Sequence, residues 1–417
     1  MVPTLFRAVA GIWLAFTTSI AFAADPLPVK RVAGVVTEYR RNSHADVILS
    51  RLLETETLDG HGRRPSLQLV SLYVDQTPPK DLSRELSAKY GFRLCRSIGE
   101  ALTLGTAELA VDGVLMIAEH GDYPESPAGQ TQYPKRRFFT EIVEVFEHSQ
   151  RTVPVFSDKH LADNTADAVW FYETAQRLKV PLMAGSSVTS TWRDPALDVL
   201  RDESLQEIVV LSYGGLEAYG FHALDLLQSL AERRLGGETG VARVRTLTGK
   251  AVWETARSES FDPQLLAAAI GRLKIRPIPP GRELRELVPE PVAYVIDYRD
   301  GLRGTVLTLN GAIAEWAVAW RGTPAAEPQS FAVDLQDDRP FMHFAHLLHG
   351  IEGLMQTRTP TWPVERTLFS SVMLDAALTS KLQRGAIIQT PVLQRRYRST
   401  WNWTQPDDAG REPKGMP

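Results

Sequence analysis

The sequence predicts an α/β protein in which an N-terminal, doubly wound parallel sheet is followed by a C-terminal α+β domain with an open, largely antiparallel sheet. Two observations support this prediction. As far as about Trp192, short apolar runs of strand length alternate with segments of helical spacing, which is typical of a parallel sheet covered by helices on both faces. Beyond it, apolar runs are joined by Asp300-Gly301 and Asn310-Gly311, dipeptides that favour hairpins between antiparallel strands.

The N-terminal half is expected to contain five buried strands separated by helices. A short, continuous apolar run indicates a strand that is covered on both faces. Ser97 and Glu100 mark the start of a short helix, because each side chain can bind a free backbone N–H group of the other residue. The strands are expected at residues 31–37, 67–74, 114–118, 153–158 and 180–184, and the longer helices at 43–54, 81–90, 134–149 and 164–179.

The second half of the chain is expected to form a separate domain. Residues 276–291 are rich in proline and charge and indicate a surface connection. We predict boundaries of 30–190 for the parallel-sheet domain and 191–395 for the α+β domain, with a loose tail at 396–417. The strands of this half are expected at residues 208–212, 241–248, 293–298, 305–309 and 331–335, and its helices at 218–234, 342–355 and 365–384.

Residues 1–23 are predicted to be a signal peptide that is removed from the mature chain. Arg7 precedes an apolar stretch at 8–20, and Ala21-Phe22-Ala23 matches the small-residue pattern of a cleavage site. The alternative is an uncleaved membrane anchor, but the apolar stretch is short for a spanning helix. We therefore expect an exported protein, periplasmic or extracellular, without stable membrane insertion after cleavage.

The composition makes some partners and sites improbable. The formal net charge is −4 at pH 7 and no long basic block exists, so nucleic acid is not an expected partner. Cys95 is the only cysteine, so an internal disulfide is impossible. His343, His346 and His349 recur every three residues, but no Glu-x-x-His or cysteine partner completes a known zinc pattern. No metal site is predicted.

Lys159 is the residue that most clearly indicates a ligand site. It follows the apolar strand at 153–158, and a helix and another strand come next, so the segment is a βαβ unit. Ligands of open α/β sheets bind outside the carboxyl ends of the strands. We interpret Lys159 as facing a ligand, the alternative being a solvated strand end. Glu119 and His120, which follow the strand at 114–118, are expected at the same crevice.

Several segments, in their order and spacing, resemble the glucose-fructose oxidoreductase and inositol dehydrogenase family. The resemblance covers nearly the whole mature chain. Each motif is weak alone, and their combination is fairly specific. The segments are Ala88–Gly91 with Ser97–Leu102, Val111–Val114, Ser157–His160 where the family carries Glu-Lys-Pro, Gly220–Asp225 where it carries Gly-x-His-x-x-Asp, and Asp375–Lys381 in the last helix.

The resemblance implies a Rossmann-like, dinucleotide-binding type of first domain and oxidation of a ring hydroxyl of a sugar or cyclitol. Lys159 would orient that hydroxyl, His222 would take its proton, and Asp225 would orient the imidazole. Histidine titrates near neutrality and suits the transfer, and a lysine stabilises negative charge on the oxygen. A lyase or glycosidase reaction through transient oxidation is a variant. A homo-oligomer through the C-terminal sheet follows from the same analogy.

The resemblance also implies NAD or NADP as cofactor. The helix start at Ser43 offers free N–H groups to phosphate, Arg40 and Arg41 offer their side chains, and Asp75 ends the second strand, where an acid binds the ribose diol. His44 is expected at the cleft, or in a solvated loop. The residues expected to face the cofactor are Thr37, Glu38, Tyr39, Arg40, Asn42, Ser43, Asp75, Glu119 and His120.

The sequence departs from the family in three places. The first strand runs into residues 37–43 without the glycines of G-x-G-x-x-G, which let the pyrophosphate approach the backbone. Ala218 stands where many members carry aspartate, and His160 replaces the proline after the lysine. The predicted leader is also of the ordinary export type, and NAD(P) is scarce outside the cytoplasm. A second hypothesis is therefore a non-redox protein that binds a carbohydrate or another polar ligand and has lost dinucleotide binding.

Trp192 follows the switch between the two predicted domains. A tryptophan there either forms one face of a sugar-binding site, because sugar rings stack on indole, or packs between the domains.

Overall fold

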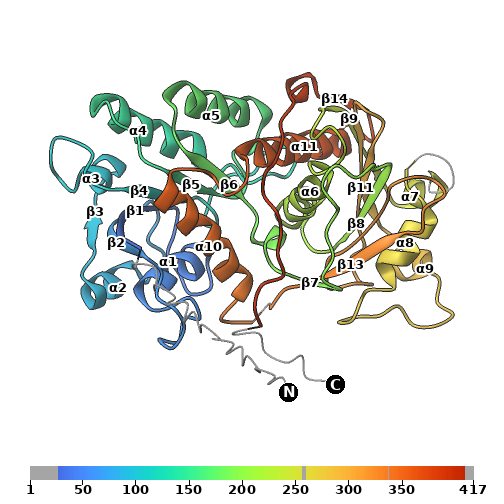
Figure 1. Ribbon diagram of the computed structural model, residues 1–417, viewed down its shortest axis with the longest axis horizontal. Helices are drawn as coiled ribbons and strands as arrows, with labels where there is room; N and C mark the ends of the chain where they lie inside the picture. Colours follow the sequence, from blue (N-terminus) through green and yellow to red (C-terminus); the bar gives the residue numbers. More distant parts are fainter. Residues whose placement is uncertain (1–26, 256–259, 337, 409–417) are drawn as a thin grey trace, which may run out of the picture.

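The protein contains two sheets that lie side by side, each flanked by helices (Figure 1). The computed structural model describes residues 27–255, 260–336 and 338–408. The predicted signal peptide, residues 1–23, lies outside the described residues. Among the helices that are described, none is both long and apolar enough to cross a membrane.

The first sheet is parallel and has the strand order β3-β2-β1-β4-β5-β6. The chain starts in the middle at β1, moves outward to β3 and then returns to the other side of β1 with β4. The carboxyl ends of β1 and β4 therefore flank the point where the strand order reverses, which is where open α/β sheets bind ligands. The prediction of a doubly wound parallel sheet is confirmed. The strands are β1 (Lys30–Val36), β2 (Leu67–Val74), β3 (Arg93–Cys95), β4 (Gly113–Ile117), β5 (Val155–Asp158) and β6 (Leu182–Gly185).

Helices cover both faces of this sheet and explain why its strands are continuous apolar runs. Strand β4, Gly-Val-Leu-Met-Ile, is buried at every position, as expected of a parallel strand between two helical layers. Side chains of α3, α4 and α5 fill one face, and side chains of α1 fill the other. The helices are α1 (His44–Leu53), α2 (Ser83–Tyr90), α3 (Ile98–Thr103), α4 (Lys135–His148) and α5 (Thr165–Leu178).

The second sheet has eight strands in the order β14-β9-β10-β11-β8-β12-β13-β7. Only the β8–β11 pair among these described strands is parallel, and the other pairs are antiparallel. The prediction of a largely antiparallel sheet is confirmed, although the predicted elements omit β12, whose two alanines favour strands weakly. The strands are β7 (Trp192–Asp194), β8 (Glu207–Ser212), β9 (Val241–Thr248), β10 (Val292–Tyr298), β11 (Arg303–Thr308), β12 (Ala317–Arg321), β13 (Gln329–Asp334) and β14 (Ile388–Gln389).

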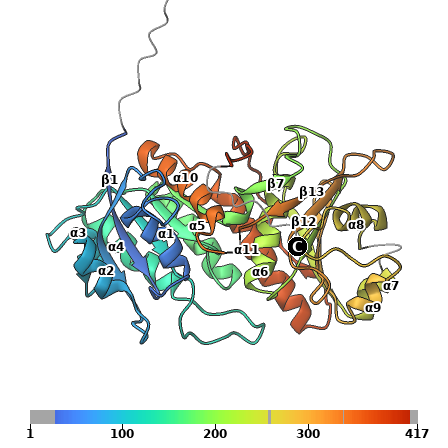
Figure 2. The same cartoon turned by 90° about the horizontal axis from the view of Figure 1, so that it is seen from below.

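Both faces of the second sheet carry helices, as the view from below shows (Figure 2). Helices α6 (Ala218–Ala231) and α11 (Val364–Leu382) pack between the two sheets. On the other face, α8 (Pro263–Ile270) lies against β8, β12 and β13, with α7 (Lys250–Thr255) and α9 (Leu284–Leu287) beside it. The face that the predicted homo-oligomer needs is thus partly covered by the chain's own helices.

Helix α10 (Met342–Thr357) crosses back to the first sheet. The prediction assigned it to the second domain, but its side chains, including Phe344 and Leu347, share a buried cluster with Val36 of β1 and Ile48 of α1. The two halves of the fold are therefore joined by packed core side chains as well as by the chain itself.

The tail is ordered as far as Asp408, so the prediction of a loose tail is wrong for residues 396–408. Tyr397 donates from its hydroxyl to Glu232 Oε2 at 2.9 Å, and Trp192 Nε1 donates to the carbonyl of Pro406 at 3.1 Å. Aromatic side chains bury large apolar areas, and the tail carries three of them at Tyr397, Trp401 and Trp403. Residues 409–417 lie outside the described residues.

We expect Tyr397→Phe to lower the free energy of unfolding by about 1–3 kcal/mol, because buried Glu232 loses a hydrogen-bond donor. Urea denaturation measures the change. Arg396→Gln is the matched control, because Arg396 is exposed and such substitutions stay within about 0.5 kcal/mol. Equal effects of the two substitutions would contradict a packed tail.

Candidate active site

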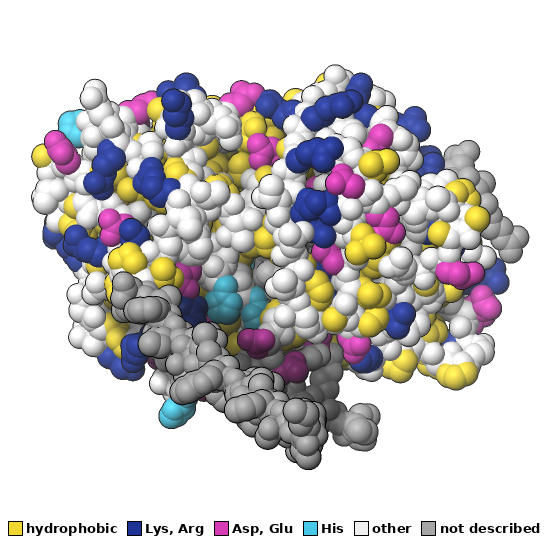
Figure 3. Space-filling view, viewed as in Figure 1, with side chains coloured by type: hydrophobic (Ala, Val, Ile, Leu, Met, Phe, Trp, Pro, Cys, Tyr) yellow, Lys and Arg dark blue, Asp and Glu magenta, His cyan; other side chains and the backbone are white. Residues whose placement is uncertain are grey.

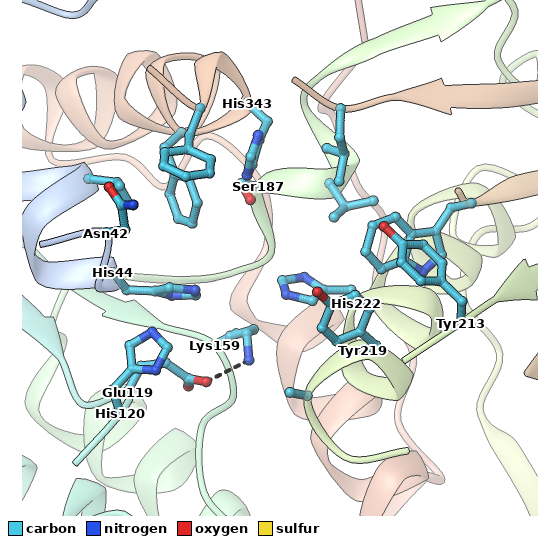
Figure 4. Close-up of a pocket in the computed structure, with 17 residues that line it drawn as sticks. Asn42, His44, Glu119, His120, Lys159, Ser187, Tyr213, Tyr219, His222 and His343 are labelled. Atoms are coloured by element: carbon cyan, nitrogen blue, oxygen red, sulfur yellow. Dashed lines mark hydrogen bonds and ion pairs between the residues drawn. The ribbon is translucent and has the colours of Figure 1, made fainter. Parts of the chain in front are cut away.

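A cavity of about 440 Å³ opens between the two halves of the molecule, at the carboxyl ends of β1, β4 and β5 (Figure 4). Its volume lies in the usual range for small-molecule sites. The space-filling view shows histidine side chains gathered in the hollow between the halves (Figure 3). The lining residues are Asn42, His44, Val47, Glu119, His120, Lys159, Ser187, Val188, Tyr213, Ala218, Tyr219, His222, Trp316, Leu335, Phe341, His343 and Phe344.

Lys159 and Glu119 form a buried ion pair on the wall of this cavity. They follow the neighbouring strands β5 and β4, and Lys159 Nζ lies 2.8 Å from Glu119 Oε1 (Figure 4). Burial disfavours both charged forms, but each charge stabilises the other. The pKa of Lys159 therefore lies above its usual value, and the pKa of Glu119 lies well below its own. Both groups are charged at neutral pH.

Lys135 fixes the strand end that carries Lys159. Its Nζ donates to the carbonyl oxygens of Asp158 and Lys159, at 3.0 and 2.8 Å. Burial lowers the pKa of Lys135 to about 8. The side chain of Lys159 is thus held from both ends, by a carboxylate at its tip and by a second lysine at its backbone.

His222 approaches the same cavity from α6, so the structure brings the predicted pair Lys159 and His222 together. His222 Nδ1 lies 2.5 Å from Ser186 Oγ. Burial, followed by the positive charge of Lys159, holds the pKa of His222 well below its usual value. The imidazole is therefore neutral at neutral pH.

Asp225 acts on His222 only through Ser186. Its carboxylate accepts hydrogen bonds from Ser186 N at 3.0 Å and from Ser370 Oγ at 2.9 Å. Burial raises the pKa of Asp225 to about 6. The predicted direct orientation of the imidazole is therefore replaced by an indirect one, in which Asp225 fixes the turn that carries Ser186.

His44 and Asp158 are a pair whose role the sequence does not reveal. His44 Nδ1 lies 2.5 Å from Asp158 Oδ2, and the His44 ring contacts His120 edge-on at 5.1 Å. The sequence places His44 at the cleft without a function, and it does not mark Asp158. The segment Asp158-Lys159-His160 could have indicated such a pair, because a buried carboxylate next to the lysine of a site needs a charged or hydrogen-bonding partner of its own.

The opposite wall of the cavity is aromatic and comes from the second half of the chain. Tyr219 stacks on Trp316 with ring centroids 5.3 Å apart and planes inclined by 20°, and Tyr213 contacts the same indole at 4.7 Å. Of the two alternatives that the sequence left open for Trp192, the structure shows packing, because Trp192 is fully buried and packs against Met342 and Ala345. Only the fold brings Tyr213, Tyr219 and Trp316 together.

The predicted cofactor residues divide into two groups. Asn42, Glu119 and His120 line the cavity. The others do not line it and are engaged by the protein itself. Thr37 Oγ1 donates to the carbonyl of Glu119 at 2.8 Å, and Glu38 pairs with Arg40 at 2.5 Å. Ser43 caps α1, and Tyr39 is fully buried with its hydroxyl 2.8 Å from Ser50 Oγ. The carboxylate of Asp75 accepts hydrogen bonds from Tyr73, Tyr123 and Arg137.

These contacts decide how a dinucleotide can fit. The start of α1, where pyrophosphate binds in Rossmann folds, holds a carboxylate already: Asp46 Oδ2 accepts from Asn42 N at 2.8 Å and pairs with Arg339 at 2.7 Å. Asp75 has both oxygens occupied. A dinucleotide fits only if its phosphates lie against side chains, and the cations at this turn are the half-exposed Arg40, the exposed Arg41 and the partly exposed Arg339.

A metal centre has no counterpart among the residues that the structure describes, because no group of three or more His, Cys, Asp or Glu side chains is placed to hold an ion. The four histidines of the cavity are His44, His120, His222 and His343. They are spread around its wall (Figure 4).

No family model and no curated protein matches the sequence, but solved structures do. GenD2 from gentamicin A biosynthesis, in complex with NAD, has a TM-score of 0.53 at 14% identity, covering 88% of this chain and 97% of that one. Scyllo-inositol dehydrogenase from Lactobacillus casei has a TM-score of 0.52 at 10% identity, covering 87% and 98%. A putative myo-inositol dehydrogenase from Sinorhizobium meliloti 1021 has a TM-score of 0.52 at 13% identity, covering 86% and 99%.

The chain has the inositol dehydrogenase fold. The resemblance to the glucose-fructose oxidoreductase and inositol dehydrogenase family is confirmed at the level of the fold. The similarity spans both domains, because each comparison covers more than four fifths of both chains.

We expect Glu119→Gln to lower the free energy of unfolding by about 3–5 kcal/mol, because it removes the carboxylate that is paired with the buried Lys159 ammonium. The double variant Glu119→Gln with Lys159→Met is expected to recover most of the loss. Urea denaturation at pH 7 measures both. A double variant as unstable as the single one would contradict the buried ion pair.

The buried histidines predict that the protein loses stability in acid. Burial lowers the pKa values of His120, His343 and His346 to about 4, 3 and 4. Between the unfolded value of about 6.5 and these values, the unfolded chain binds protons that the folded chain does not, so the free energy of unfolding falls as pH is lowered from about 6.5 to about 4. Asp225, with its raised pKa, acts in the opposite direction over a narrower range.

Urea denaturation at a series of pH values between 7 and 4 tests this dependence. His346→Gln is expected to flatten the slope, because it removes one of the buried imidazoles, which also include His222 with its lowered pKa. A free energy of unfolding that stays constant or rises as pH falls over this range would contradict burial of neutral imidazoles.

Proposed function

We propose that the protein is an NAD(P)-dependent oxidoreductase that oxidises a hydroxyl group of a sugar-like small molecule. One observation carries the proposal. The Lys159–Glu119 ion pair and the His222 imidazole converge on one cavity between the two domains. The fold supports it, because GenD2 in complex with NAD and scyllo-inositol dehydrogenase share this arrangement of domains. Export of the chain stays a prediction that depends on residues 1–23.

The walls of the cavity suit a ring that carries hydroxyl groups. The apolar C–H face of a sugar or cyclitol packs on the Tyr219–Trp316 stack. Hydroxyl groups on its edge would meet Glu119 Oε2 and His343 Nδ1, two buried polar atoms that have no hydrogen-bond partner among the residues that the structure describes. Buried polar atoms are nearly always bonded in folded proteins, so both atoms support a polar ligand.

The residues of the chain supply charge and proton acceptors. The Lys159 ammonium, placed beside the oxygen of the reacting hydroxyl, stabilises the negative charge that grows as the proton leaves. A neutral imidazole accepts that proton. When bound, an oxidised nicotinamide accepts the hydride from the carbon that carries the hydroxyl. Asn42 and His120 would hold the nicotinamide end, and Arg40 and Arg339 the phosphates.

A second candidate function is binding of a carbohydrate or another polar ligand without hydride transfer. The observation that favours it is that side chains of the protein already occupy the positions where a dinucleotide usually binds in this type of fold. Asp46 lies at the start of α1 with Arg339, and Asp75 is saturated by tyrosine and arginine donors. The cavity itself is the same in both candidates.

Cofactor content separates the two candidates. Protein purified from its native compartment is expected to release NAD(P) on denaturation, detected by absorbance and fluorescence, and added NAD(P) is expected to raise the melting temperature. A ligand at one hundred times its Kd adds about 2.7 kcal/mol. Arg40→Gln is expected to reduce the shift, because Arg40 is a half-exposed cation at the phosphate turn, where it also pairs with Glu38. If nothing is released and the melting temperature does not change, the redox proposal fails and the second candidate stands.

A further inference from the structure

The His44–Asp158 pair is built into the cavity wall by the turn after β1. Asn42 has a left-handed backbone, with φ of 62°, a conformation that asparagine tolerates better than most residues. Ser43 then caps α1, so that His44 is the first residue of the helix. Figure 4 shows its ring extending from α1 into the cavity. Nδ1 of the imidazole contacts Asp158, and the other side of the ring faces the cavity.

Asp158 gives this imidazole a defined orientation. The carboxyl group is 1% exposed, and its Oδ2 lies 2.5 Å from His44 Nδ1. Because a carboxylate accepts hydrogen bonds, the contact keeps a proton on Nδ1 and leaves the lone pair on Nε2. A buried carboxylate beside an imidazole also stabilises the imidazolium that forms when Nε2 takes a proton.

His222, which matches the family position, lacks this support. Its Nδ1 partner is the hydroxyl of Ser186, and Asp225 contacts Ser186 rather than the imidazole. The nearby charge of Lys159 disfavours a second positive charge on His222. The geometry therefore gives His44 a compensating carboxylate and gives His222 a neutral hydrogen-bonding partner.

We propose that His44, oriented by Asp158, is the residue that takes the hydroxyl proton, while His222 holds the substrate by hydrogen bonding. This inference rests on the proposed function for the identity of the reaction. The substrate O–H bond breaks, the proton forms a bond with His44 Nε2, and the electron pair stays on oxygen to form the carbonyl. The hydride acceptor is the NAD(P) of the proposed function. Asp158 stays unprotonated and pairs with the imidazolium.

The surroundings of His44 fit this assignment. His120 and Phe344 contact its ring edge-on, at 5.1 and 4.9 Å between centroids. Glu119 and Lys159, also on the wall, are paired with each other, and His343 faces the cavity from α10. The carboxylate of Asp158 is thus the charged group in direct contact with the His44 ring.

The tautomer and reactivity of His44 test the proposal without any substrate. In 15N-histidine-labelled protein at pH 7, NMR is expected to show a protonated Nδ1 and an unprotonated Nε2 for His44, assigned with His44→Gln. Diethyl pyrocarbonate, a probe of free imidazole nitrogen, is expected to modify His44 about tenfold faster than His222 by peptide mass spectrometry. Asp158→Asn is expected to slow that modification. A proton on Nε2, or His222 reacting first, would overturn the proposal.

Turnover provides the second readout. With myo-inositol, scyllo-inositol and common aldoses as substrates and NAD or NADP as cofactor, His44→Gln is expected to lower kcat about 10²- to 10³-fold with little change in KM. His222→Gln is expected mainly to raise KM. The reverse pattern would overturn the assignment of the proton to His44. Melting curves of both variants show whether they fold.

Failure of the proposed function gives a different result. In that case no NAD(P) binds and no substrate turns over, yet His44 keeps the tautomer and the reactivity described above. The pair then stands as a proton acceptor toward a bound ligand, and hydroxyl oxidation alone is rejected.

Discussion

The ion pair between Lys159 and Glu119 is the interaction on which the site depends. Two charges lie side by side at the ends of neighbouring strands, almost without exposure to water. Each would be strongly unfavourable in that position alone. Together they place an ammonium group and one free carboxylate oxygen at the cavity, where a hydroxyl group finds both a stabilising charge and an acceptor. The parallel sheet supplies the geometry, because the carboxyl ends of β4 and β5 are adjacent by topology.

The second half of the molecule completes the site through packing rather than through charge. Helix α6 brings His222 to the cavity, and Asp225 on the next turn fixes Ser186 between the two sheets. Helix α10 crosses to cover the first sheet and contributes His343 and Phe344. The relative position of the two domains is therefore set by core contacts.

The sequence predicts the fold class from local patterns, and the resemblance to the glucose-fructose oxidoreductase and inositol dehydrogenase family implies the convergence of Lys159 and His222. An apolar run that ends at a lysine indicates a strand end, and hairpin dipeptides indicate an antiparallel sheet. The aromatic wall and the His44–Asp158 pair could not be predicted, since they depend on contacts between residues that lie far apart in the chain. The prediction of a loose tail was wrong because it rested on the many polar residues of the tail. Three aromatic side chains among them pack against the rest of the protein.

The start of α1 differs from the arrangement that binds phosphate in Rossmann folds. The carboxylate of Asp46 occupies the position where a phosphate binds in Rossmann folds. The turn before the helix contains no glycine, and its Tyr39 side chain is buried in the core. A cofactor must then use arginine side chains instead of backbone N–H groups.

A crystal structure of the protein grown with NAD and scyllo-inositol would show whether the cavity holds a substrate beside Lys159 and His44. We expect a cyclitol on the Tyr219–Trp316 stack, with one hydroxyl oxygen within about 3 Å of both Lys159 Nζ and His44 Nε2, and a nicotinamide ring beside it. A ligand bound elsewhere, with the cavity filled only by water and the Lys159–Glu119 pair untouched, would contradict this expectation.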